Sequence, residues 1–239
     1  IYRQSDNSYI PFLAKEIKNN DLSEEFLTKK DDYNFVQVNS DNIKSAIIQI
    51  TDLSLKKGLD ERNVQILAPM YKGEAGIDAL NLCLQDIYNP RKRNKEEVTY
   101  GEFIYREGDK VLQLVNDLDN NVFNGDIGFI ESIVGNKIII DYDGNKVTYE
   151  KKDLKNIKHA YAISIHKSQG SEFMHVIMPI SKSYYKMLYN KLIYTGVSRA
   201  KKSLTLVGDA SAFQRAVLNN YSSSRKTSLK EQITIVYNN

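Results

Sequence analysis

The sequence is poor in cysteine, proline and tryptophan, and it lacks long apolar runs. Its 239 residues include one cysteine, four prolines and no tryptophan. A single cysteine excludes a disulfide framework and a cysteine-rich metal site, and it favours a reducing, cytoplasmic location. We expect no membrane span and no signal peptide. The chain opens with Ile1 and not with Met, which predicts a piece of a longer protein.

An excess of charge of one sign is also lacking. The chain has 33 Lys and Arg against 30 Asp and Glu, a formal net charge of +3. This balance does not indicate nucleic-acid binding by itself, so any such binding would depend on local clusters of cations. The length suffices for one large or two small domains with buried cores.

Strand and helix patterns alternate over the first ninety residues. Helical spacing of apolar residues predicts a helix over Ser8–Asn19, and alternation predicts a strand over Tyr33–Val38. Ser40 is expected to cap a second helix, and the apolar strand Val64–Ala68 precedes a helix that ends before Pro90. The alternation returns later, with strands expected at Tyr161–Ile165, His175–Ile180 and Leu204–Val207 and helices at Tyr184–Val197 and Ala210–Leu218. These patterns predict a parallel sheet covered by helices, an α/β fold.

The stretch between these two halves has an all-β pattern. Turn signals occur at Asn124-Gly125, Gly135-Asn136 and Asp143-Gly144. Short strands are expected at Val111–Val115, Ile127–Val134, Lys137–Tyr142 and Lys146–Glu150. The simplest architecture is a small β-barrel at 98–158 that interrupts an α/β domain formed by 1–97 and 159–220, with a tail at 221–239. The basic run Arg91–Lys95 is interpreted as a solvated linker in preference to a DNA-binding tail.

The segment from His159 to Glu172 (HAYAISIHKSQGSE) is the strongest candidate site. Its apolar strand breaks into a polar turn that offers a cation, hydroxyls, an amide and a glycine. In open α/β sheets ligands bind beyond the carboxyl ends of the strands, and glycine lets backbone N–H groups approach phosphate oxygens. The turn is therefore a candidate phosphate site, with an ordinary polar connection as the alternative.

Three stretches resemble motifs of one protein family. The segment Ser164–Phe173 resembles motif V of superfamily 1 DNA helicases of the RecD/TraA type, Leu192–Lys202 resembles motif VI, and Ile1–Gln4 resembles motif IV. The stretches Gly108–Val111 and Phe123–Gly128 are similar to the Src-homology-3-like barrel of that family. The resemblance implies a RecA-like second motor domain interrupted by this barrel.

The resemblance also implies a nucleotide site shared with another domain. Arg3 and Arg199 would reach the γ-phosphate of ATP as arginine fingers, because a planar guanidinium stabilises charge on phosphoryl oxygens. Gln4, Gly170 and Glu172 would lie at the nucleotide. A surface salt bridge for Arg199 and a simple surface acid for Glu172 are the alternatives. No GxxxxGK[ST] loop occurs in the sequence, so an N-terminal motor domain of the same protein would hold ATP and supply the Mg²⁺ ligands.

Contacts to single-stranded DNA are implied at the other end of the same turn. Ser164, His166, Lys167 and Ser168 would donate to phosphate oxygens without reading bases. Lys72, which follows a strand in the stretch PMYKG, is a further candidate phosphate contact. A core position for His166 and a solvated turn for Lys72 stay open as alternatives.

The barrel would lie against the same strand of DNA. Asn124 in the NGD turn, with Lys110, Asn116 and Phe123 nearby, would make these contacts. Alternatively, exposed aromatic side chains such as Tyr105 or Phe123 would bind a partner protein.

Two hypotheses about function result. The first is the C-terminal motor half of an ATP-dependent 5′-to-3′ DNA helicase, with the direction implied by the resemblance alone. Its partners would be single-stranded DNA, the N-terminal motor domain and candidate repair or recombination subunits, with no membrane. The second is a non-catalytic DNA- or protein-binding module that retains a helicase scaffold. His159 and His175 are expected to be structural, because no Cys/His spacing predicts a metal site.

Overall fold

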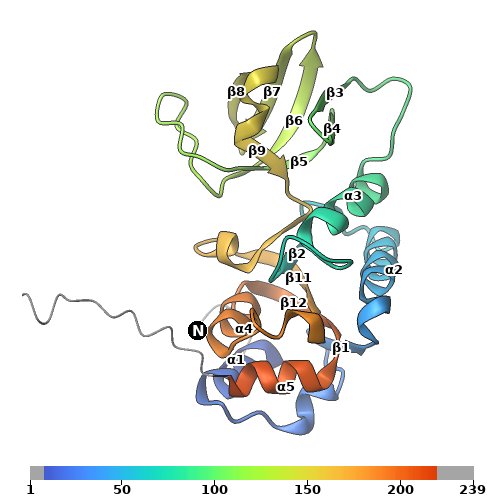
Figure 1. Cartoon of the computed structure of the whole chain (residues 1–239), viewed down its shortest axis with the longest axis vertical. Helices are drawn as coiled ribbons and strands as arrows, with labels where there is room; N and C mark the ends of the chain where they lie inside the picture. Colours follow the sequence, from blue (N-terminus) through green and yellow to red (C-terminus); the bar gives the residue numbers. More distant parts are fainter. Residues whose placement is uncertain (1–7, 220–239) are drawn as a thin grey trace, which may run out of the picture.

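A computed structural model describes residues 8–219 of the chain. Arg3, Gln4 and the tail after residue 219 lie outside the described residues. A parallel sheet with helices occupies one end of the molecule and a small antiparallel β-structure the other (Figure 1). The predicted α/β domain interrupted by a small barrel is confirmed.

The parallel sheet has five strands in the order β1-β12-β11-β2-β10. All four strand pairs are parallel. The interior strand β2 is buried at every position, as expected for a parallel sheet covered on both faces. The strands are β1 (Tyr33–Gln37), β2 (Val64–Ala68), β10 (Ala162–Ser164), β11 (Phe173–Ile180) and β12 (Ala200–Gly208).

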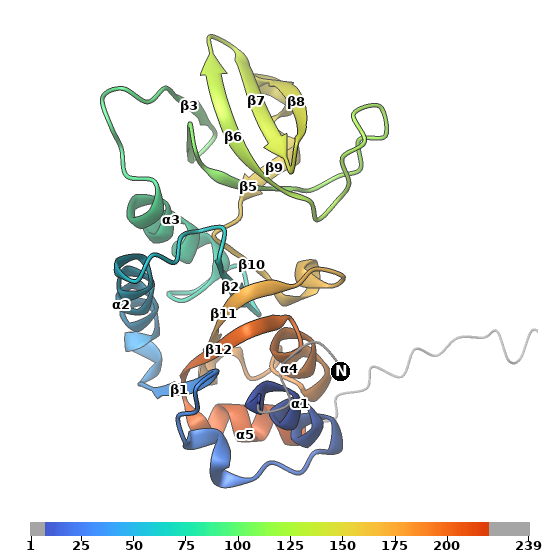
Figure 2. The ribbon, with the colours of Figure 1, turned by 180° about the vertical axis from the view of Figure 1, so that it is seen from behind.

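Helices cover both faces of this sheet. Helices α2 and α3 lie on one face and α1, α4 and α5 on the other (Figures 1 and 2). The α-helices are α1 (Tyr9–Asn19), α2 (Ile43–Lys56), α3 (Ile77–Tyr88), α4 (Asn190–Val197) and α5 (Ala210–Leu218). Short 3₁₀ helices are η1 (Glu24–Leu27), η2 (Ser40–Asn42), η3 (Lys151–Asn156), η4 (Ile165–Ser168) and η5 (Lys182–Tyr184). No helix within residues 8–219 is long and apolar enough to cross a membrane.

Two helix predictions are wrong in detail. The predicted helix Tyr184–Val197 is replaced by η5, an irregular stretch and the shorter α4. The side chain of Asn190 donates to the carbonyls of Ile17 and Val217, and these tertiary bonds fix the start of α4. Ser40 begins η2 and makes no side-chain capping bond to α2.

The inserted β-structure consists of a five-stranded antiparallel sheet, in the order β8-β7-β6-β5-β9, and a hairpin. Strand β5 covers Lys110–Gln113, so the bounds of the predicted strand Val111–Val115 lie one residue late at the start and two residues late at the end. The core of the inserted β-structure is separate from that of the parallel sheet and includes Tyr105, Val111 and Ile138. The remaining strands are β3 (Glu97–Tyr100), β4 (Phe103–Arg106), β6 (Ile127–Val134), β7 (Lys137–Tyr142), β8 (Asn145–Glu150) and β9 (Ile157–His159).

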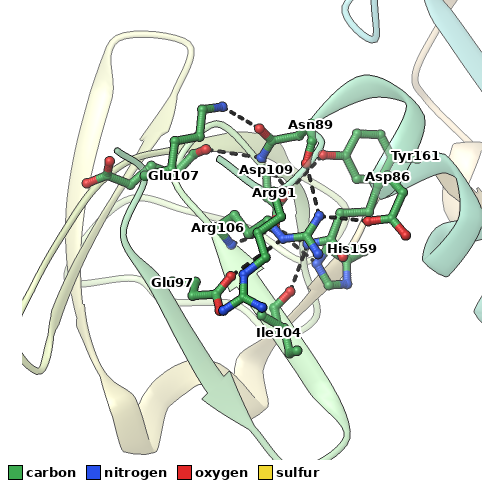
Figure 3. A network of polar contacts seen from close by, with 12 residues as sticks. Asp86, Asn89, Arg91, Glu97, Ile104, Arg106, Glu107, Asp109, His159 and Tyr161 are labelled. Carbon is green, nitrogen blue, oxygen red and sulfur yellow. Dashed lines mark hydrogen bonds and ion pairs between the residues drawn. The ribbon is translucent and has the colours of Figure 1, made fainter. Parts of the chain in front are cut away.

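A buried carboxylate joins the inserted barrel to the parallel sheet and its helices. Asp109 has no exposed surface, and its two oxygens accept hydrogen bonds from α3, the barrel and the segment before β10 (Figure 3). The donors are Gln85 Nε2 (2.6 Å), Asn89 Nδ2 (2.7 Å), the Arg106 amide (2.7 Å) and the Tyr161 hydroxyl (2.9 Å), and His159 Nε2 lies 3.2 Å away. Burial opposes ionisation of Asp109, but bonds from His159, Asn89 and the Arg106 amide hold its pKa below the usual range.

A buried ammonium group forms a second connection between the two parts. Lys110 Nζ donates to the carbonyls of Glu61 (2.7 Å) and Val64 (3.4 Å) and to Oε1 of Gln65 (2.9 Å). Lys110 is only 3% exposed and Tyr105 1% exposed. The expectations that Lys110 contacts DNA and that Tyr105 binds a partner through an exposed ring are therefore wrong.

Candidate nucleic-acid and nucleotide interface

A cavity of about 640 Å³ lies where the carboxyl ends of β2 and β10 face the barrel. Of the residues predicted to contact DNA, five line this cavity, whereas Lys110, Asn116, Phe123 and Ser168 do not. Four separate segments form its wall. They contribute Pro69, Met70, Tyr71 and Lys72 after β2, Asn124 between β5 and β6, Ser164, His166 and Lys167 around η4, and Met187 after η5.

The turn at η4 buries some of its side chains and leaves others accessible. Ser164 ends β10, and its Oγ accepts a hydrogen bond from the Lys167 amide at 3.2 Å, which caps the turn. Ile165 and Ser168 are fully buried, whereas His166 is exposed. The structure thus rejects the core position for His166.

Ser168 differs from the other predicted DNA contacts. Its hydroxyl donates to the Ile165 carbonyl at 2.7 Å, and the residue has no exposed surface. It does not line the cavity. In this structure the Ser168 side chain holds the turn together.

The barrel forms the opposite wall of the cavity. Lys167 Nζ donates a hydrogen bond to Oδ1 of Asn124, so η4 and the β5–β6 connection are in direct contact. The amide of Asn124 donates to Oδ1 of Asn116 at 2.9 Å, which orders this connection. Gly125 follows at φ +106°, a left-handed conformation that favours glycine. The ammonium group of Lys167 and the side-chain amide of Asn124 thus connect the parallel sheet to the barrel at the cavity.

The loop between β2 and α3 supplies the third wall. It is fixed by hydrogen bonds from the Ile77 amide to the Met70 carbonyl (2.9 Å) and from the Asp78 amide to the Tyr71 carbonyl (3.2 Å). Lys72 extends into solvent at the tip of this loop. A Cβ at Gly76 would lie 2.5 Å from the Tyr71 carbonyl oxygen, so the tight loop requires glycine there.

Arg199 lies at the far end of the segment that begins at the cavity. Its Nη1 donates to the Ser171 carbonyl at 3.2 Å, Nε to the Thr195 carbonyl at 3.2 Å and Nη2 to Ser198 Oγ at 3.0 Å. These bonds use only part of the guanidinium's donor set. The group is half-buried, and within residues 8–219 it makes no ion pair with a carboxylate.

Two further predicted nucleotide contacts, Gly170 and Glu172, lie next to Ser171 in the chain. Gly170 is exposed at φ +89°, with no atom near the position of a Cβ. Glu172 forms an ion pair with Lys201 at 3.0 Å. The segment Ser164–Phe173 therefore joins the cavity at one end to the surroundings of Arg199 at the other.

The predicted structural histidines fit the structure. His159 belongs to the Asp109 network, and His175 Nδ1 lies 2.7 Å from Ser203 Oγ. Burial and then the charge of Lys202 lower the pKa of His175. In residues 8–219, no group of three or more His, Cys, Asp or Glu side chains could hold a metal ion.

Sequence reasoning missed the apolar part of the cavity. Met70, Tyr71 and Met187 line it beside the cations. The adjacency of Tyr71 to Lys72 was a usable signal, since an aromatic residue next to a lysine after a strand is a common pairing in sites for nucleic acid. Met187 lies more than a hundred residues away and could not have been assigned.

Comparison with known proteins identifies both parts of the chain. Residues 80–148 match the ATP-dependent RecD-like DNA helicase SH3 domain, and residues 159–207 match the UvrD-like helicase C-terminal domain. The chain is 37% identical over 170 residues to the ATP-dependent RecD2 DNA helicase of Deinococcus radiodurans, covering 71% of this chain and 23% of that protein. It is 32% identical over 165 residues to the RecBCD enzyme subunit RecD of Buchnera aphidicola, covering 66% of this chain and 27% of that protein.

Solved structures show the same fold. A Pif1 helicase from Bacteroides in complex with ADP-AlF3 and ssDNA superposes with a TM-score of 0.53 at 18% identity, over all of this chain and 55% of that one. The chain spans about a quarter of the length of the curated relatives it matches. The predicted RecA-like sheet with an SH3-like insertion, and the resemblance to RecD-type helicases, are confirmed. The chain therefore combines a RecD-like helicase SH3 domain with a UvrD-like helicase C-terminal domain and is a homologue of the RecD helicases.

Proposed function

We propose that this chain is the C-terminal motor half of an ATP-dependent 5′-to-3′ DNA helicase. Its cavity would bind single-stranded DNA, and Arg199 would act on ATP held by an N-terminal motor domain of the same protein. The observation that carries the proposal is the segment Ser164–Phe173, which lines the cavity at one end and accepts a hydrogen bond from Arg199 at the other.

The DNA contacts would be mainly ionic. Lys72, His166 and Lys167 place cations or hydrogen-bond donors around the cavity, and Asn124 and Ser164 add polar atoms from two further directions. Such groups bind phosphate oxygens without reading the sequence of bases, as a motor that moves along any strand requires. Ser168 would contribute by holding the turn that presents His166 and Lys167.

The nucleotide contacts would come from the other end of the segment. The guanidinium of Arg199 has donors left for phosphoryl oxygens, and Arg3 would act beside it. Gly170 and Glu172 would border the nucleotide, with Gln4 as a further contact. When bound, Mg²⁺-ATP supplies the phosphoryl group that is cleaved, and its metal ligands would belong to the N-terminal domain.

A change at the nucleotide can reach DNA through this segment. If the Arg199 guanidinium turns toward a phosphoryl oxygen, it gives up its bond to the Ser171 carbonyl. The segment would then lose one of the contacts that hold this end, beside the bond from the Phe173 amide to the Arg199 carbonyl and the Glu172–Lys201 ion pair. Its other end carries His166 and Lys167 at the cavity. Repeated gain and loss of the phosphate contact would therefore tighten and loosen the hold on DNA. Some relatives are named as a subunit of the RecBCD enzyme, and this supports other DNA-repair or recombination subunits as candidate partners of the chain.

Steady-state ATP turnover of the intact helicase tests the nucleotide half of the proposal. With single-stranded DNA present, Arg199→Ala should lower turnover by about a thousandfold or more, the usual effect of losing an arginine finger. Arg199→Lys should restore little, because an ammonium lacks the planar donor pair. Lys202→Ala removes a nearby exposed cation on β12 and serves as the control. Near-normal turnover in Arg199→Ala would refute the role.

Oligonucleotide binding tests the DNA half. The double variant His166→Ala and Lys167→Ala should bind more weakly than the wild type, and its affinity should depend less steeply on salt because fewer counterions are released. The double variant Lys151→Ala and Lys155→Ala removes two exposed cations of η3 outside the cavity and is the matched control. A base preference of the wild type that survives high salt would contradict sequence-blind binding.

A further inference from the structure

Tyr71 contributes a partly exposed aromatic ring to the wall of the cavity. The residue is 41% exposed and sits between Met70 and Lys72 in the loop after β2. Hydrogen bonds on both sides of it, at the Met70 and Tyr71 carbonyls, fix the backbone that carries the ring. The loop therefore fixes the backbone from which the ring projects, although the ring is not buried in a core.

The barrel places a cation against this ring. Nζ of Lys158, in β9, lies 5.2 Å from the centroid of the Tyr71 ring, within the range of a cation–π contact. The same Nζ lies 4.0 Å from Oδ1 of Asp78 at the start of α3. The ammonium is thus positioned by two groups of the motor domain, and it supports the ring from the side of the barrel.

A cavity that bound phosphates alone would not need this apolar surface. The thioethers of Met70 and Met187 line the cavity together with the Tyr71 ring, beside Lys72 and Lys167. Every base has a π-face, so stacking on an aromatic ring adds affinity for single strands without selecting a sequence. The wall thus offers apolar contact for a base next to cations for the flanking phosphates.

We propose that Tyr71, supported by Lys158, is a stacking platform for one base of the single strand, while Lys72 and Lys167 bind the phosphates beside that base. This inference rests on the proposed function and adds a base contact to a site otherwise described by phosphates. It accounts for an exposed aromatic ring that a purely ionic site leaves unexplained.

The test measures single-strand affinity of the intact protein with two kinds of oligonucleotide. One is oligo(dT), and the other has the same number of phosphates but a central abasic stretch. Tyr71→Ala should bind oligo(dT) about tenfold more weakly, which corresponds to about 1.4 kcal/mol. The salt dependence should stay unchanged, because no phosphate contact is lost. Tyr71→Phe should bind like the wild type, since the ring is retained.

The abasic strand separates stacking from other effects of the substitution. The wild type should lose affinity for the abasic strand, and Tyr71→Ala should show no further loss on it. Tyr185→Ala is the matched control, because Tyr185 is 55% exposed with Lys186 Nζ 5.7 Å from its ring but does not line the cavity. An equal loss for Tyr71→Ala on both strands, or no loss on either, would overturn the proposal.

The result also distinguishes this inference from the function on which it rests. If the His166 and Lys167 double variant weakens binding and Tyr71→Ala does not, the platform is refuted and the DNA site stands. If neither weakens binding, the DNA site itself is refuted. A loss of ATP turnover in Tyr71→Ala at unchanged DNA affinity would instead assign the ring to contact with the N-terminal motor domain, and it too would overturn the platform.

Discussion

Asp109, the buried carboxylate at the junction between the barrel and the parallel sheet, gives the sharpest prediction about stability. Its fully buried oxygens accept from Gln85, Asn89, Tyr161 and the Arg106 amide, with His159 close by. Asp109→Asn keeps the shape of the side chain but removes the charge and turns one acceptor into a donor. Both oxygens of Asp109 accept hydrogen bonds, so the new NH₂ group would replace an acceptor at either position. The donors that bonded to that oxygen would then face another donor.

The expected cost follows from the chemistry of buried charges. Removing one partner of a buried ionic network typically costs about 3–5 kcal/mol, and a single hydrogen bond to a charged group contributes about 1.5–3 kcal/mol. Because Tyr161 can turn its hydroxyl to accept from the new NH₂ group, part of this loss is recovered. We therefore expect Asp109→Asn to lower the free energy of unfolding by about 3 kcal/mol and Asp109→Ala by about 4 kcal/mol.

The matched control is a carboxylate at the edge of the same network. Asp86 pairs with Arg106 at 2.9 Å, but its side chain is 67% exposed. Exposed ion pairs contribute about 0–1 kcal/mol, so Asp86→Asn should have little effect.

Urea unfolding followed by circular dichroism measures the free energies, and hydrogen exchange at the Arg106 amide reports on the junction itself. Equal unfolding free energies for Asp109→Asn and Asp86→Asn would refute the reasoning.

Three further predictions concern catalysis, pH and backbone geometry. The chain alone should release phosphate from ATP only at background rates, with or without single-stranded DNA, because it lacks a phosphate loop; ordinary turnover would contradict this. Burial lowers the pKa of Lys110 from 10.5 to about 7. The unfolded chain therefore binds more protons between these values, and the free energy of unfolding should rise from about pH 7 to about pH 10.5. In urea titrations at several pH values, Lys110→Met should abolish that rise. An unchanged dependence of the unfolding free energy on pH in this variant would contradict the prediction. Gly208→Ala should lower the free energy of unfolding by more than about 3 kcal/mol, because φ is +144° and the new Cβ would lie 1.9 Å from the Ile180 carbonyl oxygen. Gly58→Ala, with no atom near the new Cβ, should cost about 1 kcal/mol. Similar melting temperatures for the two variants would contradict this prediction.

The sequence predicted most strands well, including the half-exposed β6 and β7, but it missed β3, β4, β9 and the first part of β12. Val64–Ala68 was predicted with the bounds that β2 has, because a continuous apolar run is typical of a central parallel strand. Strand β12 is longer than the predicted Leu204–Val207, since it begins at Ala200 and includes the exposed Lys201 and Lys202. These two residues lie where the register between β11 and β12 shifts, and an exposed irregularity of this kind leaves no apolar pattern in a sequence.

Local motifs indicated several residues of the cavity but not that these residues lie close together in space. Lys72, Asn124 and Lys167 each follow a strand or a turn signal, and only the fold brings them to one cavity. The Asp109–His159 contact spans 50 residues and gives no periodic signal. Lys110 was mistaken for a DNA contact because a buried lysine and a surface lysine look the same in a sequence.

The strand order of the parallel sheet has a consequence for how the protein is made. β1 and β2 are both synthesised before the barrel, yet they are separated in the sheet by β12 and β11, which are synthesised after it. The barrel strands, by contrast, are contiguous in the chain from Glu97 to His159. At about 5–20 residues per second, the ribosome needs roughly 6–20 s to extend the chain from residue 97 to residue 208. During that interval the apolar strands of the first half have no partner for their edges, while the barrel has all of its own. We therefore expect the barrel to fold first on the ribosome, and the newly made first half to be the part of the chain that chaperones must protect.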